Sequence, residues 1–273
     1  MRHDARWVSF PVDGTAAHGY LARPAVATAP LPAVIVIQEI WGVDAHVQDL
    51  VQRFATAGYV ALAPDLYSRG GKPDELAPER VEAAKAFLDA LPSHTWFDAQ
   101  ARVAALERVD AAARERLRPT LDRLFSPARP IERWVEDLRA AVAFVAASRE
   151  ARGRRIGAVG YCMGGLLSAL LAAEERRLSA SVVYYGAAPS AEKAAAIRCP
   201  VLGIYGGDDP RVLTTVPQLA EGLRNAGQPF EQLLYTGAPH AFFNDTRSSY
   251  RPEAARDAWA RTLRFLSERL TPT

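Results

Sequence analysis

Hydrophobic positions along this chain alternate between two spacings, one typical of buried strands and one typical of amphipathic helices. Continuous apolar runs predict strands buried on both faces of a sheet. They occupy residues 33–37, 59–63, 156–160, 180–185, 201–205 and 230–235. Helical spacing lies between most of these runs, at residues 45–57, 166–173, 214–226 and 253–270. Strands that alternate with helices predict a mostly parallel sheet flanked by helices.

Two segments depart from this alternation. Residues 7–10 and 19–22 flank a turn at Val12-Asp13-Gly14 and predict an antiparallel hairpin. Residues 73–130 contain no strand candidate and are charged, alanine-rich and helical in pattern. We therefore expect a single α/β domain over residues 1–273 with a helical insertion at 73–130. The insertion is either a pair of stabilising surface helices or, as we favour, a cap over the carboxyl edge of the sheet.

Composition and charge exclude several classes of protein. With 33 basic and 31 acidic residues the net charge is +2, so neither nucleic acid nor an anionic membrane is an expected partner. The cysteines, Cys162 and Cys199, form no metal-ligand pattern, and no cofactor is expected. The first six residues lack the apolar core of a secretion signal, and no apolar run could span a bilayer. We expect a cytoplasmic protein, monomeric or a small homo-oligomer.

The stretch Gly160-Tyr161-Cys162-Met163-Gly164 lies between a predicted strand and a predicted helix. A strand, a G-x-nucleophile-x-G turn and a helix form the nucleophile elbow of α/β-hydrolases. The glycines permit the tight turn, and the helix N-terminus favours the thiolate of Cys162. The alternative is a small buried cysteine between glycines that serve only close packing.

An acid and a histidine follow later strands in the order that this fold requires. The strand at 201–205 leads into Asp208 and Asp209, and the strand at 230–235 leads into His240. Loops at the carboxyl ends of parallel strands can meet above the sheet, so both groups can reach Cys162. We favour Asp209 over Asp208 as the acid, because it lies at the usual offset from the strand.

Several motifs together resemble the dienelactone hydrolase family over nearly the whole chain except residues 73–130. They are Gln38-Glu39-Ile40-Trp41-Gly42, Pro64-Asp65-Leu66-Tyr67-Ser68-Arg69, Gly160-Tyr161-Cys162-Met163-Gly164-Gly165, Tyr184-Tyr185-Gly186, the Asp209 loop and His240-Ala241-Phe242-Phe243-Asn244-Asp245-Thr246. The resemblance implies the α/β-hydrolase fold and a hydrolase similar to carboxymethylenebutenolidase.

The resemblance also implies roles for further residues. Glu39 would pair with the resting thiol and accept its proton, and Arg69 would clamp a substrate carboxylate. Tyr184 and Trp41 would line the pocket, although either could be a core aromatic. The oxyanion hole of this fold would use the backbone N–H groups of Ile40 and Met163.

One position departs from the family pattern. Members that act on dienelactone are expected to carry a second arginine four residues after the histidine, where this chain has Asn244. Either an arginine of the insertion replaces it, or the pocket is shaped for a bulkier, neutral substrate.

These observations predict a hydrolase that cleaves a small-molecule ester or lactone through Cys162, His240 and Asp209 with a thioester intermediate. Three alternatives stay open: an acyl or thiol transferase, a broad carboxylesterase on the same fold, and a non-catalytic binding protein.

Overall fold

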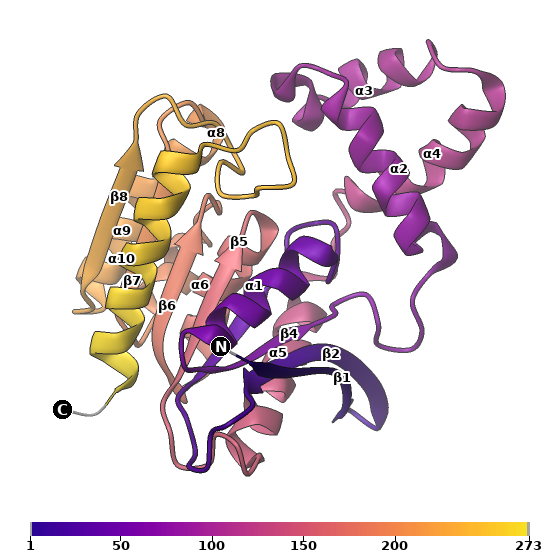
Figure 1. The fold of residues 1–273 in the computed structure, drawn as a ribbon. Coiled ribbons are helices and arrows are strands. Elements are labelled where there is room, and N and C mark those ends of the chain that lie inside the picture. The colour runs from indigo at the N-terminus through magenta and orange to yellow at the C-terminus, as the bar shows by residue number, and fades with distance from the viewer. Residues whose placement is uncertain (1, 272–273) are drawn as a thin grey trace. The chain divides into compact units, whose positions relative to one another are not determined.

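The computed structural model describes residues 2–271, apart from the side chains of Ser93 and His94, and contains a mixed sheet (Figure 1). Its strands are β1 His3–Val12, β2 Thr15–Pro24, β3 Ala33–Ile37, β4 Val60–Pro64, β5 Ile156–Tyr161, β6 Leu178–Tyr184, β7 Val201–Gly206 and β8 Phe230–Tyr235. Their order across the sheet is β1-β2-β4-β3-β5-β6-β7-β8. The β1–β2 and β2–β4 pairs are antiparallel, and every pair from β4 to β8 is parallel. The predicted mostly parallel sheet is confirmed.

The predicted hairpin is also present, as β1 and β2. It turns at Asp13 and Gly14, whose φ angles are 46° and 74°. Two successive residues with positive φ are what a tight two-residue hairpin turn of the matching twist requires.

Helices cover both faces of the sheet. Helices α1 (Ala45–Thr56) and α10 (Pro252–Leu270) share one core on one face, where the rings of Phe54 and Trp259 lie 4.7 Å apart (Figure 1). Helices α5 (Ile131–Ala147) and α6 (Met163–Glu174) pack against each other and on the other face. Shorter helices, α7 (Ala191–Ala195), α8 (Pro210–Leu213) and α9 (Val216–Asn225), connect the last strands.

Helix α1 shows why the local sequence pattern predicts this fold well. Asp44 caps its start by accepting a hydrogen bond from the backbone N–H of Val47 at 2.9 Å. Val47 and Phe54 lie on the predicted apolar stripe, and both are buried. Burial of that stripe, rather than helix propensity alone, holds a helix of this length against the sheet.

Residues 70–130 form a separate compact unit, distinct from the unit made by residues 1–69 and 131–273. It contains η1 (Asp74–Leu76), α2 (Pro78–Asp89), η2 (Ser93–Phe97), α3 (Ala99–Leu106) and α4 (Ala111–Leu124). It has buried apolar residues of its own, and the Trp96 indole N–H donates to the Leu88 carbonyl at 2.7 Å. The predicted helical insertion at 73–130 lies within this unit. Its role as a cap stays a prediction.

The carboxyl ends of the parallel strands bring together side chains that are far apart in the sequence. Glu39 follows β3, Cys162 follows β5 and Tyr185 follows β6. Asp209 follows β7 and His240 follows β8. Because these strands are parallel, all five residues lie at one edge of the sheet. Among the described helices, none has both the length and the hydrophobicity that a membrane span requires.

Candidate active site

Cys162 occupies a strained turn between β5 and α6. Its φ and ψ are 54° and −114°, a conformation that residues with a side chain rarely adopt. A Cβ atom on Gly160 would collide with the backbone of Gly164, and one on Gly164 would collide with the backbone of Ile37 at the end of β3. Both glycines of the motif are therefore required by close backbone approach, and the turn holds the thiol at the first turn of α6.

His240 links Cys162 to Asp209. Its Nε2 lies 3.1 Å from the Cys162 sulfur, and its Nδ1 lies 2.5 Å from Asp209 Oδ2. Asp209 is 5% exposed and also caps α8 by accepting from the Val212 N–H at 3.4 Å. Asp208, the alternative acid, is exposed to solvent. The structure thus brings together the three residues that the sequence order singles out, and it is the carboxylate of Asp209 that lies beside His240.

The electrostatics of this cluster favour a charged imidazole. Burial opposes protonation of His240, but the neighbouring Cys162 and the hydrogen-bonded Asp209 together outweigh it. They raise the pKa of His240 from 6.5 to about 10. The contribution of Cys162 is that of its thiolate charge, so the imidazolium of His240 is favoured when Cys162 is ionised.

Glu39 is held beside this cluster by Asn244. The carboxylate is 2% exposed, and its Oε2 accepts a hydrogen bond from Asn244 Nδ2 at 2.8 Å. Its Oε1 is buried and has no hydrogen-bond partner among the described residues. In this structure the Cys162 thiol is in contact with His240, and Glu39 is engaged by Asn244. The predicted pairing of Glu39 with the thiol stays a prediction.

The loop that carries Asn244 is fastened to α1. His46 Nδ1 lies 3.1 Å from Asp245 Oδ1, and Arg53 binds the other carboxylate oxygen of Asp245. The hydrogen bond from His46, followed by that from Arg53, outweighs burial and holds the pKa of Asp245 below its usual range. These contacts join residues that are 199 and 192 positions apart, and they have no signal in local sequence patterns.

The predicted oxyanion-hole residues occupy suitable backbone positions. Met163 is the first residue of α6, where N–H groups have no carbonyl partner within the helix. Ile40 follows β3, and its carbonyl accepts a hydrogen bond from the Tyr67 hydroxyl at 2.8 Å, which holds the loop. Trp41 is 7% exposed, and the guanidinium carbon of Arg247 lies 4.8 Å from its ring centroid. A role in the oxyanion hole for Ile40 and Met163, and in the pocket for Trp41, stays a prediction.

Arg69, the predicted carboxylate clamp, is bound to carboxylates of the protein itself. Its Nη1 lies 3.0 Å from the buried Asp137 of α5, and its Nη2 lies 2.8 Å from Asp13 in the β1–β2 turn. A third partner, Glu136, lies at 3.4 Å. A substrate carboxylate would have to compete with these groups, so the structure gives Arg69 a stabilising role that the sequence did not indicate.

Tyr184 does not fit its predicted role in lining a pocket. It is completely buried, and its hydroxyl donates to the Ala258 carbonyl at 3.1 Å and lies 2.6 Å from the Thr262 hydroxyl of α10. Its neighbour Tyr185 turns toward the site instead, with its ring centroid 5.2 Å from that of His240. Strand β6 ends at Tyr184, and Tyr185 has a φ of 38°, so the backbone turns between the two residues and directs the second ring toward His240.

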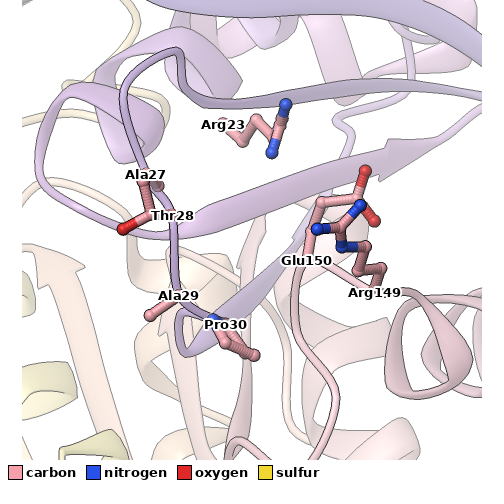
Figure 2. Close-up of a pocket in the computed structure, with 7 residues that line it drawn as sticks. All are labelled: Arg23, Ala27, Thr28, Ala29, Pro30, Arg149 and Glu150. Atoms are coloured by element: carbon pink, nitrogen blue, oxygen red, sulfur yellow. The ribbon is translucent and has the colours of Figure 1, made fainter.

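A pocket at the opposite edge of the sheet is unrelated to this cluster. Figure 2 shows its lining residues beside the loop after β2 and the end of α5. Its volume is about 440 Å³. It is lined by Arg23, Ala27, Thr28, Ala29, Pro30, Arg149 and Glu150. Within the described part of the chain, no group of three or more His, Cys, Asp or Glu side chains could hold a metal ion.

The profile of the dienelactone hydrolase family matches residues 17–270. The chain belongs to the dienelactone hydrolase family. A Saccharolobus solfataricus protein provisionally named carboxymethylenebutenolidase is 33% identical over 261 residues, covering 95% of this chain and 96% of that protein. A Bradyrhizobium protein provisionally named 2-oxo-3-(5-oxofuran-2-ylidene)propanoate lactonase is 29% identical, covering 95% and 92%.

Solved structures agree with this family membership. The crystal structure of a Klebsiella pneumoniae protein, provisionally named dienelactone hydrolase, superimposes with a TM-score of 0.75 at 31% identity. The superposition covers 98% of this chain and 100% of that one. The fold is therefore the α/β-hydrolase fold that the sequence predicts.

Proposed function

We propose that this hydrolase cleaves an ester or a lactone through a thioester on Cys162. The observation that carries the proposal is the continuous contact from Cys162 through His240 to Asp209. A nucleophile, a base within hydrogen-bond reach and a third group that orients the base are the parts that acyl transfer needs.

In the proposed reaction the Cys162 thiolate attacks the substrate carbonyl. The backbone N–H groups of Ile40 and Met163 stabilise the oxyanion. Beside the thiolate and Asp209, His240 takes up a proton from solvent and acts as the acid that protonates the leaving oxygen. The proton of the resting thiol passes to Glu39 instead. After the alcohol or enol leaves, His240 in its neutral form activates the water that hydrolyses the thioester.

The nature of the nucleophile favours activated substrates. A thiolate is a good leaving group, so the tetrahedral intermediate of an unactivated ester tends to expel the thiolate and return to substrate. An enol lactone has a better leaving group and proceeds to the thioester. The Bradyrhizobium relative, named as a lactonase on an oxofuranylidene compound, supports a lactone as the substrate class.

The test compares hydrolysis of a carboxylated dienelactone with that of a neutral p-nitrophenyl ester. We expect Cys162→Ala to abolish turnover of either, and an acyl adduct on Cys162 to appear by intact-mass analysis of the acid-quenched enzyme. Asp209→Asn should lower kcat strongly, whereas the matched change Asp208→Asn, on the exposed neighbour, should leave it nearly unchanged.

The outcomes separate the alternatives. Turnover of the dienelactone requires a group that holds its carboxylate, and turnover of the neutral ester alone indicates a broader esterase. An acyl adduct that forms but is discharged only to an added alcohol or thiol identifies a transferase. Turnover that survives Cys162→Ala, or no adduct and no turnover with either compound, would refute the proposal.

A further inference from the structure

Asn244 has a defined orientation at the position where the family pattern has arginine. The side chain is completely buried. Its Oδ1 accepts two hydrogen bonds from Thr246, one from the backbone N–H at 3.1 Å and one from the hydroxyl at 2.7 Å. Since a carbonyl oxygen accepts and an amide nitrogen donates, the opposite end of the amide must be the nitrogen. That nitrogen therefore donates to Glu39.

The segment that carries Asn244 is bonded to α1. Asp245, the next residue, is bound by both His46 and Arg53 of α1. The two bonds from Thr246 hold the amide itself, and the contacts of Asp245 hold the backbone next to it. The hydrogen bond to Glu39 is thus preorganised rather than formed by a flexible side chain.

The backbone next to Glu39 lies against the turn that carries the Cys162 thiol. The carbonyl of Gln38, which immediately precedes Glu39, is in tight contact with Gly164, two residues after Cys162. Burial first, and then the charge of Glu39 and that of Cys162, raise the pKa of the Tyr185 hydroxyl. The Tyr185 hydroxyl is therefore within electrostatic range of both Glu39 and Cys162. With Oε2 occupied by Asn244, Oε1 is the oxygen left to accept a proton.

We propose that Asn244 is the positioning residue for Glu39. Its uncharged amide binds Oε2 and leaves Oε1 to take the proton from the Cys162 sulfur. This step converts a thiol and a carboxylate into a thiolate and a carboxylic acid, so charge and atoms balance. The inference rests on the proposed function of Glu39. Because the amide carries no charge, Asn244 holds Glu39 without adding a positive charge beside it.

The experiment is a double-mutant cycle between positions 39 and 244. Asn244→Asp keeps the size of the side chain but replaces the donor by an acceptor. It should lower kcat, and the rate of Cys162 alkylation by iodoacetamide at pH 7, about ten-fold or more, with little change in KM. In the Glu39→Gln background the same change should cause no further loss, because the glutamine amide can donate to the new carboxylate.

The pH profile and a second variant separate positioning from a structural effect. The pH dependence of alkylation should change on Asn244→Asp in the wild-type background and stay unchanged in the Glu39→Gln background. Thr246→Val removes only the hydroxyl bond to Asn244 Oδ1 and should give a smaller loss that also disappears with Glu39→Gln. It serves as the test if Asn244→Asp does not fold, as judged by circular dichroism.

A loss of equal size in both backgrounds, or no loss in the wild-type background, would overturn the proposal. Failure of the proposed function has a different signature. The wild-type enzyme would then lack turnover that depends on Cys162, while alkylation of Cys162 would still report on Glu39 and Asn244. Cys199 is buried, and Cys162→Ala measures its background labelling.

Discussion

Replacing Tyr184 by Phe removes one oxygen atom from the core between the sheet and α10. The hydroxyl donates to the Ala258 carbonyl and is paired with the Thr262 hydroxyl. A buried hydrogen bond contributes about 0.5–1.5 kcal/mol net to the free energy of unfolding. Removing one partner costs more when the other is left buried without a hydrogen bond. The Thr262 hydroxyl can turn to the Ala258 carbonyl, four residues earlier on the same helix. We therefore expect a loss of about 1–2 kcal/mol in the free energy of unfolding.

The assay is thermal unfolding by calorimetry together with kcat and KM for the best substrate. A loss of this size lowers Tm by about 2–4 °C per kcal/mol for a chain of this size. KM should not change, because the hydroxyl faces α10. Combining Tyr184→Phe with Thr262→Val removes both partners and should destabilise less than the sum of the single changes.

Tyr185→Phe is the matched control. The Tyr185 hydroxyl is buried without a hydrogen-bond partner among the described residues, so its removal should leave Tm unchanged or raise it slightly. An unchanged Tm with a several-fold higher KM for Tyr184→Phe would refute the reasoning. It would mean that Tyr184 lines the pocket, as the family resemblance implies.

Three further changes test the site and its support. Gly164→Ala drives a methyl group into the carbonyl of Ile37 and should destabilise the protein by about 1–3 kcal/mol, seen as a lower Tm with reduced kcat; a normal Tm would contradict the packing argument. In an NMR titration, His240 should titrate near pH 10, and Asp209→Asn should lower that value; an unshifted value would mean that Asp209 does not stabilise the imidazolium. The pKa of Asp245 is lower in the folded protein than its ordinary value of 3.8, so its ionised carboxylate stabilises the fold at any pH above 3.8. This stabilisation is lost as the pH falls below 3.8 and through the lower pKa of the folded state. Asp245→Asn should therefore lower Tm at pH 7 and have a smaller effect at pH 3; equal effects at both would contradict the linkage.

Several features of the fold follow from sequence alone because they depend on local chemistry. Apolar runs predict the parallel strands within a few residues, and helical spacing predicts α1 and α10. The elbow around Cys162 needs glycines on both sides, and the chain supplies them as Gly160 and Gly164. Chain order also selects His240 and an acid after β7, since the loops of parallel strands meet at one edge.

Only the tertiary structure decides which side chains meet. The choice between Tyr184 and Tyr185 depends on where β6 ends and the backbone turns, which local pattern does not determine, because both residues are aromatic. Arg69 binds Asp137 on a helix far along the chain, so its partners are invisible to motif reasoning.

The same limit applies to Asn244. The sequence marks it as a departure from the family, but its contact with Glu39 joins positions 205 residues apart. Local sequence patterns predict helices, strands and turns, because these depend on interactions between residues that are close in the sequence. The contact between Asn244 and Glu39 forms only after the sheet has brought the two segments together.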